Sequence, residues 1–312
     1  MKSMLKGRSL LTLKDFSAAE IRFVLDLAAQ VKAEAHAGKV NQRLRGKTVA
    51  LIFEKRSTRT RCSFETAVGE EGGHPVFLTL NDIHLGEKEP IQDTARVLGR
   101  MFSAIEFRGY RQETVESLAK FSGIPVYNGL TDDWHPTQIL ADLLTVEEVF
   151  GSLRGRKLAF LGDGRNNVAN TLLVGCSRMG VDVTIVSPRE LRPAEDLVRW
   201  AGQEAGRNGS RVELIADVEA GVKGVDVVYT DVWVSMGEEA KSAERLRLLE
   251  PYRVTREVLA MTGRKESIFM HDLPAVRGNE VTGDVLDGES SRAWDQAENR
   301  KHTIKALLLA TL

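Results

Sequence analysis

Cysteine is scarce in this chain of 312 residues: its two cysteines, Cys62 and Cys176, lie in different segments and have no CxxC or Cys/His spacing around them. This argues against a disulfide framework or a zinc site. Long apolar runs are missing too. The first segment, MKSMLKGRSLLTLKDFSAAEI, lacks the apolar core of a secretion signal, and no other segment approaches a membrane span. We therefore expect a cytoplasmic protein without a membrane partner.

An excess of either charge is also absent. The chain has 43 Lys and Arg against 44 Asp and Glu, so its formal net charge of -1 gives no overall basic field that would indicate a nucleic-acid partner. Hydrophobic residues at 42% and charged residues at 28% are typical of a soluble globular protein. The length suits two domains of ordinary size or one large one.

Short β-branched runs alternate with amphipathic runs along almost the whole chain. The strand-like runs are TVALIF, PVFLTL, SAIEFRG and IPVYNGL in the first half, and RKLAFLGD, VDVTIVSP, RVELIAD, DVVYTDVWV and SIFMHDLP in the second. This alternation predicts an α/β fold with two doubly wound domains, each a parallel sheet covered by helices. We expect the domains at residues 1–150 and 151–290, and a final helix within 291–312 that packs back across one of them.

The run FEKRSTRTRCSFETA concentrates hydroxyl and basic residues where the strand TVALIF gives way to a helix. A helix N-terminus attracts anions through its unpaired N–H groups and partial positive charge. Ser57, Thr58 and Thr60 add hydroxyl donors, and Arg59 adds a planar fork that suits phosphate oxygens. An isolated Ser-Thr pair is more often a simple helix cap. Four donors in a row after a buried strand favour a phosphate site, although not a P-loop, whose glycines and lysine are missing.

Further polar side chains follow other predicted strands. Arg108 closes AIEFRG, while His135 and Gln138 lie in DDWHPTQ, where Pro136 suits the first turn of a helix. In a parallel sheet all three approach the same edge as Arg59. A lone histidine more often has a structural role, but the loop position of His135 at this edge supports a catalytic role equally well.

In the second half, FLGDGRNN follows a strand but has Asn167 where a dinucleotide fingerprint needs its third glycine. Asn167 can instead reach a substrate, and either Asn166 or Asn167 can cap the next helix. The run TDVWVSMGEE offers Asp231, Ser235 and Met236, and a carboxylate beside a hydroxyl suits the ammonium group of a small substrate. The alternative is a surface loop in which Asp231 caps a turn.

Two features lie near the C-terminus. In FMHDLPAVRGNE, Pro274 restricts Leu273 to extended geometry, from which the Leu273 carbonyl can face a ligand. Arg300 adds one more cation if its helix crosses the binding cleft. The alternative, a solvated helix charge, is favoured by the residues alone.

These motifs together resemble the aspartate/ornithine carbamoyltransferase superfamily, and within it the ornithine branch. STRTR, DTARVLGRMF, HPTQ, DVWVSMGEE and AENRKHTIKALL occur in the family's order and spacing, and the resemblance covers nearly the whole chain. It implies that residues 1–150 bind carbamoyl phosphate, that 151–290 bind the amino acid, and that 291–312 return to the first domain. It also implies carbamoyl transfer to the side-chain amine of L-ornithine, giving L-citrulline and phosphate, without metal or organic cofactor. The family forms rings of three copies, and further assembly is left open.

The resemblance implies roles for individual residues. Those for carbamoyl phosphate are Ser57, Thr58, Arg59, Thr60, His84, Arg108, His135, Gln138, Leu273 and Arg300. Among them, Arg108 would bridge phosphate and carbonyl oxygens, and His135 and Arg300 would polarise the carbonyl. Gln138 would hold the carbamoyl amide, and the Leu273 backbone oxygen would receive the NH2 group. Those for ornithine are Asn167, Asp231, Ser235 and Met236.

The chain departs from the family pattern at a few positions. Asp272 stands where the ornithine branch has the cysteine of HCLP, and a carboxylate there would raise the pKa of the reacting amine and oppose its attack. Asp272 is therefore turned away, serves as a base, or indicates a different amine. In the loop that reaches a neighbouring subunit, His84 and Pro90 replace glutamine and serine, and His84 can replace the glutamine as donor. SMGEE keeps the ornithine pattern, which argues against putrescine.

Carbamoyl transfer to ornithine, in arginine synthesis or breakdown, is the leading hypothesis. A carbamoyltransferase for lysine, putrescine or an acylated ornithine is the second. A catalytically silent regulatory or structural homologue is the third, and the retained Arg59, Arg108 and His135 argue against it. A nicotinamide dehydrogenase is the weakest, because the third glycine of its fingerprint is missing.

Overall fold

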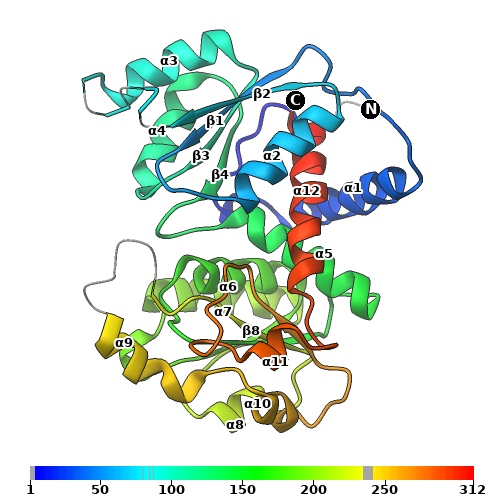
Figure 1. The fold of residues 1–312 in the computed structure, drawn as a ribbon, viewed down its shortest axis with the longest axis vertical. Helices are drawn as coiled ribbons and strands as arrows, with labels where there is room; N and C mark the ends of the chain where they lie inside the picture. Colours follow the sequence, from blue (N-terminus) through cyan, green and yellow to red (C-terminus); the bar gives the residue numbers. More distant parts are fainter. Residues whose placement is uncertain (1–3, 80, 84, 87, 235–241) are drawn as a thin grey trace. The chain divides into compact units, whose positions relative to one another are not determined.

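The computed structural model describes residues 4–79, 81–83, 85–86, 88–234 and 242–312. The chain divides into two compact units: unit 1 is Met1–Leu144 with Glu298–Leu312, and unit 2 is Thr145–Ala297. The divisions fall inside two helices, α5 (Pro136–Phe150) and α12 (Ala293–Thr311), as Figure 1 shows. That each unit binds one substrate stays a prediction.

Unit 1 contains a four-stranded parallel sheet in the order β2-β1-β3-β4. Its strands are β1 (Thr48–Phe53), β2 (His74–Thr79), β3 (Ala104–Arg108) and β4 (Val126–Leu130). Besides parts of α5 and α12, its helices are η1 (Leu13–Asp15), α1 (Ala18–His36), α2 (Arg59–Glu70), α3 (Ile91–Met101) and α4 (Gln112–Ser122). Figure 1 shows α3 and α4 on one side of this sheet and α1, α2 and α12 on the other.

The alternation of side chains along the strands separates an apolar layer from a polar one. Ile52 of β1 and Ile105 and Phe107 of β3 belong to a hydrophobic cluster with α3 and α4. Because successive strand residues point to opposite faces, Glu106 and Arg108 of β3 face the side of α2 and α12. Charged side chains are thus directed to one face of the sheet.

The end of the chain packs on the elements of unit 1. Lys305 Nζ lies 2.6 Å from Glu70 Oε2 on α2, and the hydroxyl oxygens of Tyr127 on β4 and Thr311 are 2.6 Å apart. The backbone N–H of Gly7 donates to the Thr311 carbonyl over 2.9 Å. The predicted return of the final helix to the first sheet is confirmed.

Unit 2 contains a five-stranded parallel sheet in the order β7-β6-β5-β8-β9. Its strands are β5 (Lys157–Leu161), β6 (Asp182–Val186), β7 (Val212–Ile215), β8 (Val227–Thr230) and β9 (Ile268–Met270). Its helices include α6 (Asn167–Met179), η2 (Arg189–Leu191), α7 (Glu195–Asn208), α8 (Val218–Val222), α9 (Ser242–Leu249), η4 (Glu250–Tyr252), α10 (Arg256–Met261) and α11 (Gly283–Leu286). The strand order reverses between β5 and β8, and open α/β sheets bind ligands at such a switch point.

The predicted fold class is confirmed, because every strand-like run contains a strand and both sheets are parallel. Within the strand-like run DVVYTDVWV, β8 ends at Thr230, so Asp231 follows the strand as predicted. This strand end leaves Asp231 just beyond the sheet, at the switch point. Within the described ranges, no helix is long and apolar enough to cross a membrane.

Candidate active site

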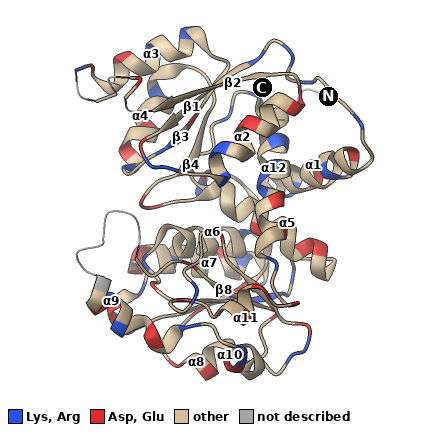
Figure 2. Ribbon diagram, in the orientation of Figure 1, with Lys and Arg blue, Asp and Glu red and all other residues tan. Residues whose placement is uncertain are grey.

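The first turn of α2 combines a capping serine with a basic side chain. The Ser57 Oγ accepts the backbone N–H of Thr60 over 3.1 Å, so the capping role is confirmed for Ser57. The Thr58 side chain makes no capping hydrogen bond and is exposed, and Arg59 is half-buried. The first turn has no acidic residue, and Figure 2 shows basic residues where α2 begins. This helix end therefore keeps its attraction for anions.

Not every basic residue of this run belongs to the site. Arg61 Nε donates to Glu65 Oε1 over 3.0 Å, and its guanidinium lies 3.6 Å from the centroid of the Phe77 ring. Lys55 forms an ion pair with Asp132. Both side chains are held by partners away from the helix start, whereas Arg59 is itself the first residue of α2.

Two buried guanidinium groups converge on the hydroxyl of Thr60. Arg108 Nη1 donates to Thr60 Oγ1 over 3.1 Å, and Arg300 Nη2 donates to the same oxygen over 3.0 Å. Arg300 is 1% exposed, so the interpretation of its charge as solvated is wrong. Burying two like charges side by side is costly unless an anion compensates them. The structure thus brings together Thr60, Arg108 and Arg300 as the sequence predicted.

Gln138 orients Arg300. Its Oε1 accepts from Arg300 Nη1 over 2.6 Å, and its Nε2 donates to Asp142 Oδ1 over 2.8 Å. Thr137 Oγ1 lies 3.4 Å from Arg300 Nη2. Thr137 and Asp142 were missed by the sequence analysis, although Asp142 lies one helical turn after Gln138. The contact of Gln138 with a carbamoyl amide stays a prediction.

His135 is a neutral imidazole at neutral pH. Burial lowers its pKa well below the usual 6.5, and the charges of Arg300, Arg108 and Arg59 lower it further. The side chain is 2% exposed. A neutral ring can donate one hydrogen bond to a developing negative charge without itself carrying a charge.

Glu106 is a member of this group that the sequence analysis missed. Burial raises its pKa well above the usual 4.5, and Arg108 and Arg300 only partly oppose that rise. Among the described residues, neither carboxyl oxygen has a hydrogen-bond partner. The alternation in AIEFR could have found it, because Glu106 and Arg108 are two residues apart on one strand and share a face. Because a raised pKa favours the neutral carboxyl, Glu106 offsets the charge of the two arginines less than an ordinary carboxylate would.

In unit 2, polar groups from β5 and β8 meet at the switch point. Asn166 caps α6, because its side chain accepts the Ala169 N–H over 2.7 Å, so the capping role is confirmed for Asn166. Asn166 Nδ2 also donates to Asp231 Oδ2 over 2.7 Å, and Asp231 Oδ1 accepts the Val232 N–H over 2.6 Å. Asn167 opens the helix and is half-buried. Asn166 therefore has a second function, as the residue that positions Asp231.

Three predicted residues, His84, Ser235 and Met236, lie outside the described ranges, and their roles stay predictions. Pro90 is described, as the residue before α3.

A buried network follows β9. The His271 ring lies 3.2 Å from Glu280 Oε1 through Nε2, and its Nδ1 accepts the Leu273 N–H over 2.8 Å. Leu273 has a φ of 61°, so the expectation of extended geometry is wrong. The hydrogen bond to His271 holds the turn in this left-handed conformation, which is costly for a branched side chain.

Asp272 points into this network rather than away from the protein. Its side chain is 10% exposed, and Oδ1 lies 3.5 Å from His271 Nδ1. Burial raises the pKa of Asp231 well above its usual value, and the negative charge of Asp272 raises it further. Burial lowers the pKa of His271, but hydrogen bonds with Asp272 and Glu280 outweigh it and bring that pKa to about 9. The two aspartates therefore share protons as a like-charged pair.

The charge on His271 is linked to the Leu273 turn. Because Nδ1 accepts the Leu273 N–H, the ring in this structure is neutral and carries its proton on Nε2, toward Glu280. Protonation of Nδ1, which the neighbouring carboxylates favour, breaks the hydrogen bond to Leu273. Asp231, His271 and Asp272 could also be considered as metal ligands, because their ligand atoms lie within 4.8 Å of one another. A carboxyl that holds its proton is a poor ligand, which argues against a metal here.

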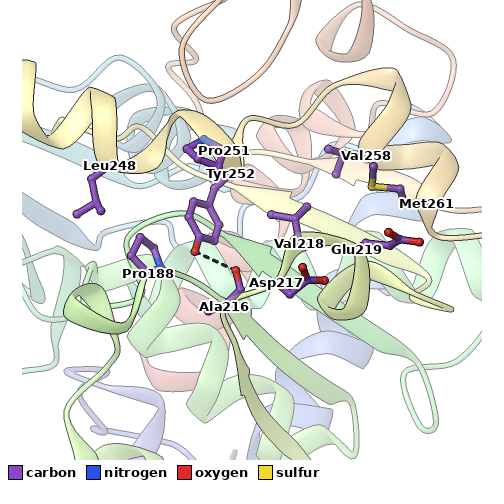
Figure 3. Close-up of a pocket in the computed structure, with 10 residues that line it drawn as sticks. All are labelled: Pro188, Ala216, Asp217, Val218, Glu219, Leu248, Pro251, Tyr252, Val258 and Met261. Atoms are coloured by element: carbon purple, nitrogen blue, oxygen red, sulfur yellow. Dashed lines mark hydrogen bonds between the residues drawn. The ribbon is translucent and has the colours of Figure 1, made fainter.

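Unit 2 also has a pocket of about 540 Å³ that contains none of the predicted site residues. Figure 3 shows Tyr252 in the middle of its lining, with Leu248 and Met261 on opposite sides, and the Tyr252 hydroxyl donates to the Ala216 carbonyl over 2.9 Å. The lining, taken over the described residues, also includes Asp217 and Glu219 but no arginine or histidine.

Comparisons with known proteins agree on one kind of enzyme. Residues 8–148 match the family model "Aspartate/ornithine carbamoyltransferase, carbamoyl-P binding domain", and residues 154–311 match "Aspartate/ornithine carbamoyltransferase, Asp/Orn binding domain". Ornithine carbamoyltransferase of Caldanaerobacter subterraneus subsp. tengcongensis is 65% identical over 99% of this chain and 98% of its own. That of Thermotoga petrophila is 58% identical over 100% of both chains. The structure of ornithine carbamoyltransferase from Pyrococcus furiosus is similar with a TM-score of 0.96 at 45% identity, covering 100% of this chain and 98% of that one.

Proposed function

The chain belongs to the aspartate/ornithine carbamoyltransferase family, and from this membership we propose that it transfers the carbamoyl group of carbamoyl phosphate to the side-chain amine of L-ornithine, giving L-citrulline and phosphate. The resemblance carried by STRTR, HPTQ and AENRKHTIKALL is thereby confirmed. Relatives that carry the ornithine name align over nearly the whole chain, which supports ornithine over the alternative amines.

One observation carries the first half of the proposal: the guanidinium groups of Arg108 and Arg300 meet at the Thr60 hydroxyl. They lie beside the start of α2 and near Glu106, whose pKa burial raises well above its usual value. A doubly negative phosphate supplies the charge that this buried group requires. We assign the phosphate to Ser57, Thr58, Arg59, Thr60 and Arg108.

The reaction follows from this arrangement. The neutral amine attacks the carbamoyl carbon, the carbonyl oxygen becomes an oxyanion, and the bond from that carbon to the phosphate oxygen then breaks. Arg108 and Arg300 stabilise the oxyanion by charge, and neutral His135 does so by donating a hydrogen bond. Each preorganised donor is typically worth about 3 kcal/mol of barrier. The departing phosphate takes up the proton that the amine releases, and no metal or organic cofactor is required.

For the amino acid we assign the switch point of unit 2, with Asn167 and Asp231 from the described part, and we assign Ser235 and Met236 from the family resemblance alone. Burial raises the pKa of Asp231, and the positive charge of the α-ammonium group of ornithine would favour its ionised form. Asp272 lies next to it, and we assign Asp272 as a base that takes up protons during the cycle. We further assign the Leu273 carbonyl to the carbamoyl NH2 group.

Citrulline formation tests this proposal directly. Purified protein is incubated with carbamoyl phosphate and ornithine, and citrulline is measured colorimetrically. Product is expected only when both substrates are present. A parallel panel of lysine, putrescine and N-acetylornithine addresses the amine, because Asp272 replaces the family cysteine. Turnover of a panel amine with a higher kcat/KM than ornithine would transfer the proposal to that amine, and no turnover of any amine would overturn it.

We also propose that the chain works as a cytoplasmic homotrimer, in line with its family, and we leave higher multiples open. Light scattering behind size-exclusion chromatography should then give a mass of about three times the 34.5 kDa of one chain. A single-chain mass at working concentration would contradict this assembly.

A further inference from the structure

His36, Glu298 and His302 form a cluster in unit 1 that the proposed reaction does not use. His36 is the last residue of α1, and Glu298 and His302 are one turn apart on α12. His36 Nε2 lies 2.9 Å from Glu298 Oε1, and His302 Nε2 lies 3.3 Å from the same oxygen. The two rings meet edge to face, with centroids 6.0 Å apart. Two imidazole nitrogens and a carboxylate oxygen thus face a common point.

The spacing of these atoms fits a small metal ion. Zinc binds nitrogen and carboxylate oxygen at about 2.0–2.2 Å, so neighbouring ligands in a tetrahedral site lie about 3.4 Å apart. The two contacts to Glu298 Oε1, at 2.9 and 3.3 Å, need little adjustment to reach that separation. Two histidines and a glutamate also form a ligand set that holds zinc in known enzymes, with water as the fourth ligand. The exposed side chain of His36, 60% accessible, leaves room for that water.

The charge state of the cluster favours a cation. A metal binds the neutral form of a histidine ring and the ionised form of a carboxyl, so this ligand set presents one negative charge to the ion. The three ligand atoms lie within 4.8 Å of one another. Lys32 and Lys301 are the cations that act on the cluster. They are engaged by Asn299 Oδ1 at 2.8 Å and by Glu70 Oε1 at 3.1 Å, respectively.

We propose that His36, Glu298 and His302 form a binding site for a divalent transition metal of the zinc type. The metal joins the C-terminal end of α1 to the turn of α12 that also carries Arg300. Arg300 lies between two of the ligands in sequence, so the metal stabilises the helix turn from which this buried guanidinium reaches Thr60.

The affinity is expected to be moderate. A metal-bound histidine usually donates its second ring N–H to a carboxylate or carbonyl, and loss of that partner costs about 10- to 100-fold in affinity. The Nδ1 atom of His302 is buried and has no hydrogen-bond partner within the described part of the chain. We therefore expect a dissociation constant in the micromolar range rather than the nanomolar range of fully supported zinc sites.

Metal stoichiometry tests the proposal without reference to catalysis. Untagged full-length protein, treated with EDTA and dialysed against about 50 µM ZnCl2, is expected to retain one zinc per chain by elemental analysis. Zinc should also raise the melting temperature of the wild type by a few degrees, because it binds the folded state. His36→Ala is the decisive variant, since this exposed side chain can be removed without disturbing the core. It should lose both the zinc and the temperature shift.

Two controls make the result unambiguous. His74→Ala removes an exposed histidine of β2 that belongs to no such cluster, and it should keep the zinc and the shift. Asp272→Asn changes a residue of the group in unit 2 whose ligand atoms also lie close together, Asp231, His271 and Asp272. This variant should also keep the bound zinc and the shift in melting temperature. Wild-type protein that retains no zinc overturns the proposal, and so does unchanged zinc binding in His36→Ala.

Discussion

At the scale of single residues, Arg59 and Arg61 form a natural pair for comparison. Arg59 lies at the start of α2 beside the buried cations, whereas Arg61 is bound to Glu65 and packs over Phe77. We predict that Arg59→Ala weakens the binding of inorganic phosphate about 10- to 100-fold, because a charge-assisted hydrogen bond is worth about 1.5–3 kcal/mol. Arg61→Ala should change it less than about twofold. Calorimetry measures both, and equal losses in the two variants would contradict the assignment.

Glu106 allows a prediction about pH. Its folded-state pKa is raised from 4.5 by burial, so the folded protein keeps a proton that the unfolded chain releases above that value. The stability contributed by this proton is complete below pH 4.5 and is lost as pH rises toward the folded pKa. Glu106→Gln keeps the shape and removes the titration. Its free energy of unfolding should therefore rise relative to wild type between about pH 5 and 7, by at most about 1.4 kcal/mol per pH unit.

Urea unfolding at both pH values measures this difference, and circular dichroism establishes that the variant folds. Phosphate binding should be preserved, because glutamine is neutral like the protonated carboxyl it replaces. If the difference in free energy of unfolding between Glu106→Gln and wild type is the same at both pH values, Glu106 is ionised in the folded protein.

At the scale of elements, the sequence predicted strands better than contacts. Short β-branched runs bounded by turns identify strands, and parallel pairing then places Arg59, Arg108 and His135 at one sheet edge. The burial of Arg300 could not be predicted, because helical periodicity shows which face is apolar and not which element covers it. Leu273 was mispredicted because the hydrogen bond to His271 that holds its conformation depends on the folded chain.

The attachment of α12 to α2 can be tested with two lysines. Lys305 is 5% exposed, with Nζ 2.6 Å from Glu70 Oε2 and 3.8 Å from Glu71 Oε1, and Glu71 is buried. Lys305→Met should lower the free energy of unfolding by about 1–3 kcal/mol, because it removes the charge-assisted hydrogen bond from a nearly buried ammonium group to Glu70, while Glu71 keeps Arg43 as its partner. Lys301→Met removes a more accessible partner of Glu70 and should cost less than about 1 kcal/mol. Urea titrations that rank the two variants in the opposite order would contradict this account of the helix attachment.

At the scale of the whole molecule, the two sheets carry sites of different chemistry. Unit 1 gathers arginines around Thr60, and unit 2 gathers carboxyl groups around His271. The net charge of -1 hides this separation, because opposite local charges cancel in the total. Composition therefore gave no indication of a nucleic-acid partner and could not show where a phosphate or an ammonium group would bind. That information came from motifs at strand ends, and the contact of Asn166 with Asp231 came from the fold alone.

Because one substrate is assigned to each unit, a substitution in one unit should leave binding of the other unit's substrate unchanged. Asp231→Asn keeps the size of the side chain but removes the carboxylate assigned to the α-ammonium group of ornithine. Its kcat/KM for ornithine should fall at least about 10-fold, as expected for a lost charge-assisted contact. Its affinity for phosphate should stay within about twofold of wild type, because the phosphate is assigned to unit 1. Arg59→Ala should show the loss of phosphate affinity that Asp231→Asn lacks. If calorimetry finds that phosphate binding is impaired equally in both folded variants, the assignment of one substrate to each unit is wrong.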